Sequence, residues 1–195
     1  MTNDKLKYKD FFKNSMLNEF TDMPPAHVQR AESNKFSNKL INYIKHVENG
    51  NKSGYKNGKW YPIPSIEGGT PTIAYGHKIT GRGSNYANGL TDHEANELLN
   101  RDLESAKQIV YHDIHHMFKV KLPTLDADKE EMLIDFAYNL GTLDKFPKFV
   151  RAVLTNDWKT AAKEYKRTAT EKNGNKIDLG RNKVFFDVFL KPHLK

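Results

Sequence analysis

Residues 49–77 are rich in glycine, proline, asparagine and threonine, and they stand between two segments whose apolar residues recur at helical spacing. Short runs at 59–63 and 70–75 favour small paired strands, and Gly68-Gly69 favours a tight turn. A turn-rich segment inserted between helices restricts the chain to a small β lobe beside a helical one. We therefore expect an α+β fold, with the β lobe at about residues 50–80.

The helix before this segment is predicted to begin near residue 34. Its apolar face consists of Phe36, Leu40, Tyr43, Ile44 and Val47. Glu48 comes directly after this face, and Gly50 is placed to end the helix. A carboxylate in a last turn is unfavourable for the helix dipole, so Glu48 taken alone fits a solvated surface residue.

Further helical patterns lie beyond the turn-rich segment. Thr91 and Glu94 form a capping box, and an apolar stripe over 95–109 continues from it. A second helix is predicted from Asp126 to Leu140, ended by Gly141. Shorter helices are expected at 145–154, 157–168 and 181–190, with a polar loop at 169–180.

Residues 1–30 form a separate segment that is rich in lysine and asparagine, and Pro24-Pro25 divides it from the rest of the chain. Its apolar residues fit one short amphipathic helix: Leu6, Phe11, Phe12, Met16, Leu17 and Phe20. That helix either packs on its own domain or serves as a docking arm or frayed tail. We expect an N-terminal extension over 1–30 and one domain over 31–195.

The charge and composition limit the partners. The 31 Lys and Arg exceed the 24 Asp and Glu and give a net charge of +7, which favours nucleic acid, anionic lipid surfaces or acidic cell-wall polymers. The absence of cysteine excludes disulfides and thiol catalysis. No apolar stretch reaches the roughly 18 to 20 residues of a membrane span, and the N-terminus lacks the roughly 7 to 15 apolar residues of a secretory signal. We expect no integral membrane segment.

Glu48 and Glu67 are the only carboxylates between residues 48 and 77. One ends a helix and the other lies in a turn-rich loop, so the two can face each other across a cleft between lobes. Glycoside hydrolysis uses such a pair, with one protonated acid for the leaving oxygen and one carboxylate to activate water or stabilise the charged transition state. Spacing in sequence does not fix the distance, and two surface glutamates remain the alternative.

Three histidines, His112, His115 and His116, have the spacing of metal ligands on a helix. The sequence has no cysteine, no H-E-x-x-H motif and no obvious third ligand to join two of these imidazoles, so we expect a solvated or partly packed helix face and no metal.

The segment from Lys52 to Trp60 interleaves lysines with aromatic residues. This pattern fits stacking on nucleobases or sugar rings, and equally a solvated loop with one buried tryptophan. No recognised nucleic-acid motif is present, so we expect no nucleic-acid partner.

Four elements in order resemble the phage-type lysozyme family, the muramidase endolysins of tailed bacteriophages. They are Glu48 with Thr72-Ile73-Ala74-Tyr75-Gly76-His77, Leu90-Thr91-Asp92-His93-Glu94-Ala95 running to Asp102, Phe136-Ala137-Tyr138-Asn139-Leu140-Gly141, and Gly180-Arg181. The resemblance covers about residues 35–190. It implies a lysozyme-like α+β fold in which the active cleft lies between a small β lobe and a larger helical lobe.

The resemblance also implies catalytic roles. Glu48 matches the general acid that protonates the glycosidic oxygen, and Thr72 matches the threonine that helps hold the hydrolytic water. Where the family usually places an aspartate or cysteine this chain has Ile66, so Glu67, one position later, is the candidate for the second carboxylate. The segment between Glu48 and Thr72 is also longer than the family pattern.

Other matching residues are expected to support the cleft. His77 and Asp102 match a structural ion pair of relatives, and Asn139, Gly141 and Arg181 match positions at the cleft or between lobes. No metal or organic cofactor is implied.

The implied reaction is hydrolysis of the β-1,4 bond between N-acetylmuramic acid and N-acetylglucosamine in peptidoglycan, with inversion, by a monomer. The expected location is the host cytoplasm before release to the wall through a holin pore, or alternatively the virion. Two other functions remain open: a virion tail or structural component that binds cell wall and docks through residues 1–30, and a basic effector of anionic membranes.

Overall fold

The structure is a computed structural model that describes residues 36–64, 69–80, 86–119, 125–170 and 176–194. It divides the chain into residues 1–33 and residues 34–195, and all the helices and strands named here belong to the second unit. The predicted helix and extension at 1–30 lie outside the described residues, as do Glu67 and Gly68.

The first described helix, α2, spans Asn38–Asn49, as the apolar spacing predicts. Ser37 caps it, because its hydroxyl accepts a hydrogen bond from the backbone N–H of Leu40 at 3.1 Å. The face that carries Leu40, Tyr43 and Ile44 is buried. Glu48 and Asn49 therefore lie in the last turn, at the end that faces the β part of the chain.

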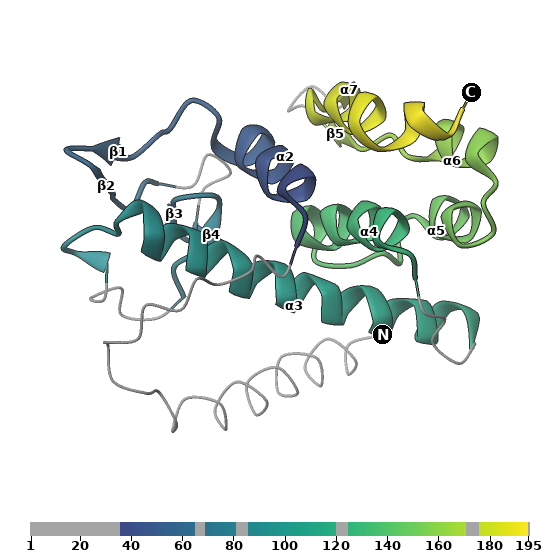
Figure 1. Cartoon of the computed structure of the whole chain (residues 1–195), viewed down its shortest axis with the longest axis horizontal. Coiled ribbons are helices and arrows are strands. Elements are labelled where there is room, and N and C mark those ends of the chain that lie inside the picture. The colour runs from purple at the N-terminus through teal and green to yellow at the C-terminus, as the bar shows by residue number, and fades with distance from the viewer. Residues whose placement is uncertain (1–35, 65–68, 81–85, 120–124, 171–175, 195) are drawn as a thin grey trace. The chain divides into compact units, whose positions relative to one another are not determined.

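Two long helices form the centre of the fold (Figure 1). Helix α3 spans Asp92–Phe118, and both hydrogen bonds of the predicted capping box are present between Thr91 and Glu94. It runs beyond the predicted stripe. Helix α4 spans Ala127–Leu140 and packs along α3; Asp126 caps its start, and Gly141 ends it with φ +70°.

The shorter elements complete the helical part. They are α5 (Pro147–Leu154), α6 (Trp158–Glu164), α7 (Arg181–Phe185), the π-helical turn Phe186–Leu190 and the 3-10 turn Lys191–His193. The helices predicted at 145–154 and 181–190 are therefore present, while the one predicted at 157–168 ends early, at Glu164.

The prediction of a polar loop at 169–180 is wrong, because the described residues of this range include paired strands. Strand β5 (Thr168–Thr170) pairs antiparallel with β6 (Lys176–Asp178). The threonines and isoleucine of these short runs favour extended backbone even though the surrounding residues are polar. The same preference explains why α6 does not continue to residue 168.

The β part consists of two local hairpins. Strands β1 (Tyr55–Lys56) and β2 (Lys59–Trp60) are joined by Asn57 and Gly58, both with positive φ, which is the geometry of a tight two-residue hairpin. Strands β3 (Thr72–Ile73) and β4 (His77–Lys78) form the second hairpin. The segments predicted to pair, 59–63 and 70–75, meet at one bridge between Ile63 and Thr72.

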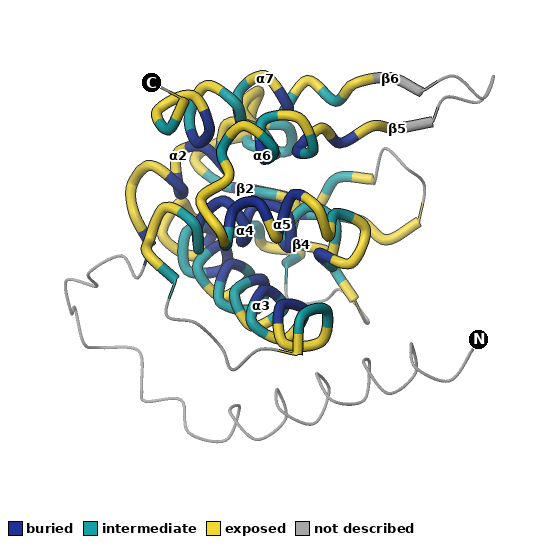
Figure 2. Tube along the Cα trace, turned by 90° about the vertical axis from the view of Figure 1, so that its right-hand side faces the viewer, coloured by how far each residue is buried: buried dark blue, intermediate teal, exposed yellow. Residues whose placement is uncertain are grey.

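Two apolar clusters share helix α3. The larger lies among the helices and includes Phe136, Phe149 and Phe185; the smaller lies under the hairpins and includes Trp60 and Ile73. Figure 2 shows α4 buried over much of its length, whereas α3 alternates buried and exposed residues. The α+β fold expected from the sequence is thus the fold observed, with hairpins on one end of α3 and helices on the other.

Candidate active site

Glu48 is partly buried and ion-paired. Its side chain is 19% exposed, and its Oε1 lies 2.7 Å from Nη1 of Arg181 at the start of α7. The Arg181 side chain is only 8% exposed. The two residues come from opposite ends of the domain sequence, so tertiary packing alone brings them together. Glu48 is not the solvated surface residue that its place in the helix would suggest.

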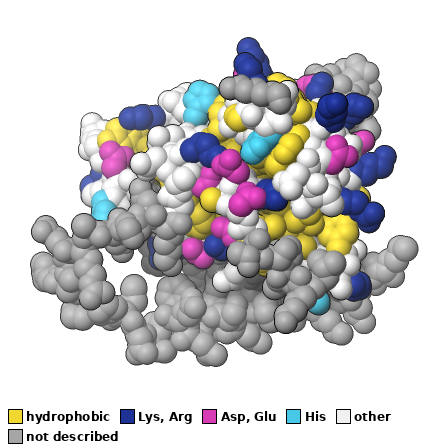
Figure 3. All heavy atoms as spheres, turned by 45° about the vertical axis from the view of Figure 1, so that its right-hand side comes forward, with side chains coloured by type: hydrophobic (Ala, Val, Ile, Leu, Met, Phe, Trp, Pro, Cys, Tyr) yellow, Lys and Arg dark blue, Asp and Glu magenta, His cyan; other side chains and the backbone are white. Residues whose placement is uncertain are grey.

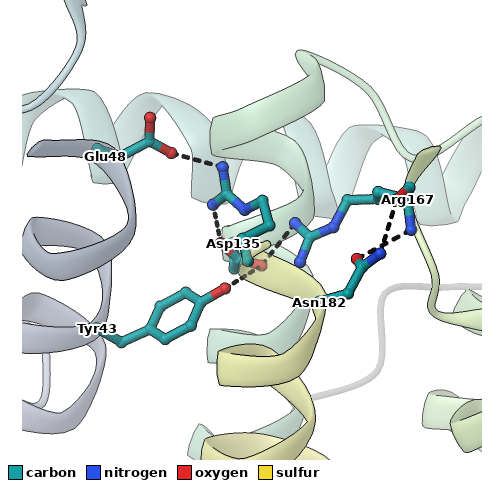
Figure 4. A network of polar contacts seen from close by, with 6 residues as sticks. Tyr43, Glu48, Asp135, Arg167 and Asn182 are labelled. Carbon is teal, nitrogen blue, oxygen red and sulfur yellow. Dashed lines mark hydrogen bonds and ion pairs between the residues drawn. The ribbon is translucent and has the colours of Figure 1, made fainter. Parts of the chain in front are cut away.

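Arg181 also bonds a second carboxylate, that of Asp135 on α4; Figure 4 labels Glu48 and Asp135 in this network. Its Nη2 lies 2.6 Å from Oδ1 of Asp135, which is completely buried. One guanidinium therefore bridges two carboxylates. Burial alone would lower the pKa of Arg181, but Asp135 and then Glu48 raise it, so the bridge stays cationic.

Asp135 has two further partners. Nη1 of Arg167 donates to its Oδ2 at 2.7 Å, and the Tyr43 hydroxyl donates to the same oxygen at 3.3 Å. Burial, and next the charge of Asp135, raises the pKa of Tyr43, which keeps this hydroxyl protonated as a donor. Both oxygens of the buried carboxylate are thus satisfied by charged or polar donors.

Arg167 is fixed from several sides. Its guanidinium lies 4.2 Å from the centre of the Phe136 ring and 5.1 Å from that of Phe185. Asn182, next to Arg181, clamps the Arg167 backbone: its Oδ1 accepts the N–H at 3.0 Å and its Nδ2 donates to the carbonyl at 2.7 Å. Four side chains of alternating charge are thus bonded in series, and we name them the ion-pair network: Glu48, Arg181, Asp135 and Arg167.

The second oxygen of Glu48 faces the turn between β3 and β4. A side-chain carbon placed on Gly76 would stand 3.5 Å from Oε2 of Glu48, and Gly76 has φ +93°. Asn49 anchors this turn, because its Nδ2 donates to the carbonyls of Ala74 at 2.7 Å and Ser53 at 2.9 Å. The Tyr138 hydroxyl donates to the carbonyl of Tyr75 at 2.7 Å. The backbone beside the carboxyl is therefore held from α2 and α4.

Thr72 lies on β3, opposite Lys78. Its backbone exchanges two hydrogen bonds with Ile63, at 2.8 and 2.9 Å. Among the described residues no hydrogen bond joins Thr72 to Glu48. Glu67, the predicted second carboxylate, lies outside the described residues, as does Ile66.

His77 and Asp102 lie in contact. The Nδ1 of His77 on β4 is 3.0 Å from both carboxylate oxygens of Asp102 on α3. The Tyr86 hydroxyl lies 3.4 Å from the other ring nitrogen. This contact ties the second hairpin to the long helix.

Asn139 and Gly141 lie at the end of α4. Neither makes a hydrogen bond to Glu48 within the described part of the chain. The Oδ1 of Asn139 is buried and accepts no hydrogen bond from any described residue. The Gly141 N–H donates to the Ala137 carbonyl at 2.8 Å and closes the helix. Arg181, by contrast, hydrogen-bonds Glu48 directly.

Sequence reasoning missed Asp135 and Arg167. The sequence contains a signal for Asp135, because it is the one charged residue in the otherwise apolar run from Met132 to Ala137, which is buried on α4. A charged residue inside a buried helical face requires a partner. Nothing in the local pattern around Arg167 shows that it supplies one.

The histidine group on α3 has an ordinary helical arrangement. The rings of His112 and His116 stack with centres 6.3 Å apart, and Nδ1 of His112 lies 3.2 Å from Oδ1 of Asp113. Across the described residues no group of three or more His, Asp or Glu side chains is placed to hold a metal ion. No helix in those segments is long and apolar enough to cross a membrane.

Two lysines, one just before the first hairpin and one in β1, lie over tyrosine rings. Lys52 Nζ stands 5.1 Å from the ring centre of Tyr55, and Lys56 Nζ 4.8 Å from that of Tyr61. Trp60 is buried, and its Nε1 donates to Oδ1 of Asp92 at 2.7 Å, so it does not stack on a ligand. Elsewhere charges of both signs mix; on the face in Figure 3, acidic and basic side chains lie interspersed.

The fold and this site define a lysozyme-like protein. The structure is similar to the solved muramidase domain of SpmX from Asticaccaulis excentricus, with a TM-score of 0.56 and 22% sequence identity over 81% of this chain and 99% of that one. No curated protein gives a significant match to the chain.

The sequence matches the phage lysozyme family over residues 55–181. The chain belongs to the phage lysozyme family, a family of peptidoglycan hydrolases. The matched range includes Thr72, His77, Asp102 and Arg181 and begins after Glu48, so the role of Glu48 depends on its geometry.

Proposed function

We propose that this protein is a muramidase that hydrolyses the β-1,4 bond between N-acetylmuramic acid and N-acetylglucosamine in peptidoglycan, with Glu48 as the general acid. The observation that carries the proposal is the position of Glu48. In a chain of the phage lysozyme family, this partly buried carboxyl ends α2, is held by Arg181 and faces the β3–β4 turn.

The two oxygens of Glu48 have different tasks in this proposal. Oε1 accepts the hydrogen bond of Arg181, which fixes the orientation of the carboxyl. Oε2 lies beside Gly76, which has no side chain to cover it, and in this proposal Oε2 carries the proton to the glycosidic oxygen. The bond between C1 and that oxygen then breaks, and water adds to C1 to leave a new reducing end.

The water is activated on the opposite face of the sugar ring. We assign this step to Glu67, with Thr72 holding the water, which gives inversion at C1. Carboxyl groups about 6.5 to 9.5 Å apart are the separation that inversion requires, and a separation near 5 Å would favour retention. A crystal structure with a bound glycan tests this part directly.

The reaction is tested with purified peptidoglycan. After digestion, the new reducing ends are reduced with borohydride and the fragments are identified by mass spectrometry. A muramidase gives reduced muramic acid at the new ends, whereas reduced glucosamine would mean that the other glycosidic bond is cleaved. Release of no reducing ends would refute the enzymatic function itself.

We further propose that the protein acts as a monomer on the wall after release from the host cytoplasm through a holin pore. Light scattering during chromatography tests the monomer. Mass spectrometry of purified virions tests the location, because recovery of the protein in virions would favour a lysin carried by the particle.

A further inference from the structure

Asp135 and Arg167 lie behind the candidate acid and do not touch it. We propose that they are positioning residues whose charges control the ionisation of Glu48 through Arg181, so that Arg181 can orient the acid without keeping it ionised. This inference depends on the proposed role of Glu48 as general acid.

The problem that this arrangement solves is electrostatic. A general acid must hold its proton until the glycosidic oxygen takes it. A guanidinium 2.7 Å away favours the ionised carboxylate instead. An acid held by Arg181 alone would therefore be well oriented and too easily ionised.

Asp135 offsets the positive charge of Arg181, because it is ion-paired with the same guanidinium. It bonds the second arm of the same guanidinium at 2.6 Å, and it is completely buried, where charges are weakly screened. At the position of Glu48, the negative charge of Asp135 offsets part of the positive charge of Arg181. The hydrogen bond from Arg181 remains, but its bias toward the ionised acid becomes smaller.

Arg167 reduces the effect of the Asp135 charge on Glu48, because it is ion-paired with Asp135. Its side chain is 1% exposed, and its ion pair with Asp135 at 2.7 Å satisfies a charge that has no access to water. The rings of Phe136 and Phe185 lie beside its guanidinium, and Asn182 holds its backbone. Arg167 thus shields Glu48 from the full charge of Asp135.

Other groups near Glu48 complete the electrostatic surroundings in the described residues. On α4, burial raises the pKa of Tyr138, as do the charges of Asp102 and Glu48. The contact of His77 with Asp102 lies near Tyr138 on the side of β4 and α3. On α2 itself lie Tyr43, bonded to Asp135, and Lys45, whose Nζ is 5.3 Å from the centre of the Tyr75 ring. Of the two residues in the proposal, Asp135 bonds Arg181 directly and Arg167 bonds Asp135.

The proposal predicts shifts of opposite sign. Asp135→Asn removes the negative charge and leaves Arg181 fully effective, so Glu48 ionises more easily and the alkaline limb of the activity profile moves down by about one pH unit. Arg167→Gln exposes Glu48 to Asp135, so the limb moves up. In the double variant Asp135→Asn with Arg167→Gln both charges are gone and Arg181 acts alone, so the limb lies between that of Asp135→Asn and that of the unmodified protein.

The measurement is the initial rate of reducing-end release from purified peptidoglycan over about pH 4 to 9 at constant ionic strength. Thermal unfolding is followed at each pH. Asp113→Asn is the matched control, because Asp113 is also a buried aspartate and does not belong to the ion-pair network. It accepts hydrogen bonds from the Thr142 hydroxyl and the Leu143 N–H. This control variant is expected to lower the melting temperature and leave the alkaline limb in place.

Shifts of the same sign, or lower rates at every pH with no shift, would overturn the proposal in favour of a structural role. If Asp135→Asn does not fold, Arg167→Gln and the double variant still decide between these results. An unmodified protein that releases no reducing ends would instead refute the proposed function.

Discussion

Arg181 Nη1 lies 2.7 Å from Oε1 of Glu48, although the two residues are 133 positions apart in the chain. The contact joins the end of α2 to the start of α7. Because the candidate acid is oriented by a residue of the last helices, the site is complete only when those helices have packed against α2 and α4. Loss of that packing should therefore reduce activity and stability together.

Replacing Arg181 by glutamine tests this coupling. The change leaves Asp135 buried with one cation fewer, and removing one member of a buried ion pair typically costs about 3 to 5 kcal/mol. We expect the free energy of unfolding in urea to fall by about that amount and reducing-end release to fall at least about tenfold.

Arg181→Lys is the matched comparison, since lysine keeps the charge and loses the two-armed geometry. It should recover part of the stability and less of the activity. An unfolding free energy unaffected by Arg181→Gln would show that the bridge between Glu48 and Asp135 does not stabilise the fold.

Asn49 is expected to stabilise the turn beside the acid. Asn49→Ala leaves the buried carbonyl of Ala74 without its donor, which typically costs about 1 to 3 kcal/mol. Amide hydrogen exchange in the β3–β4 hairpin should become faster and thermal stability should fall. Asn51→Ala, at an exposed position of the same loop, is the control and should change neither. Equal effects of both substitutions would contradict the anchoring role.

The capping box of α3 makes stability depend on acid pH. The backbone N–H of Thr91, followed by its hydroxyl, lowers the pKa of Glu94 from 4.5. A lowered pKa in the folded state means that this stabilisation is present above pH 4.5 and is lost as the pH falls through the folded value. Glu94→Gln should therefore lower the melting temperature at neutral pH and much less in strong acid. Glu97→Gln on the same helix serves as control, and a parallel loss at both pH values in Glu94→Gln would argue against the cap.

Two lysines, one just before the first hairpin and one in β1, should contribute to the affinity of the protein for cell wall. Lys52 and Lys56 are exposed and form no ion pair with a carboxylate among the described residues. Replacing both by glutamine should weaken retention on acidic cell walls roughly two- to fivefold at low salt and have little effect at high salt. A matched double replacement of Lys159 and Lys163 on α6 removes the same charge elsewhere. Equal losses in the two variants would mean that net charge alone governs retention.

The sequence is most informative where structure depends on neighbours in the chain. Helices α2, α3 and α4 follow from apolar spacing, and the sequence predicts the capping box of Thr91 and Glu94. The β5–β6 hairpin escaped prediction because its strands are short and polar, so the turn formers around them dominated the pattern.

The candidate site shows the opposite limit. Asp135 bonds Arg167 and Arg181, which are 32 and 46 positions away, and only tertiary packing around α4 sets those distances. Resemblance to a family identified Glu48 and Arg181 as separate residues of interest. Their bond, and the buried carboxylate behind it, required the structure.

The central claim is that Glu48 is the general acid, and Glu48→Gln tests it most directly. Glutamine keeps the size of the side chain and an oxygen for Arg181 but has no acidic proton to transfer to the glycosidic oxygen. The matched control is Glu130→Gln, because Glu130 is 17% exposed and pairs with Lys107 at 3.0 Å. We predict that Glu48→Gln folds and releases essentially no reducing ends from peptidoglycan, while Glu130→Gln remains active. Reducing-end release by folded Glu48→Gln at the rate of the unmodified protein would contradict the assignment.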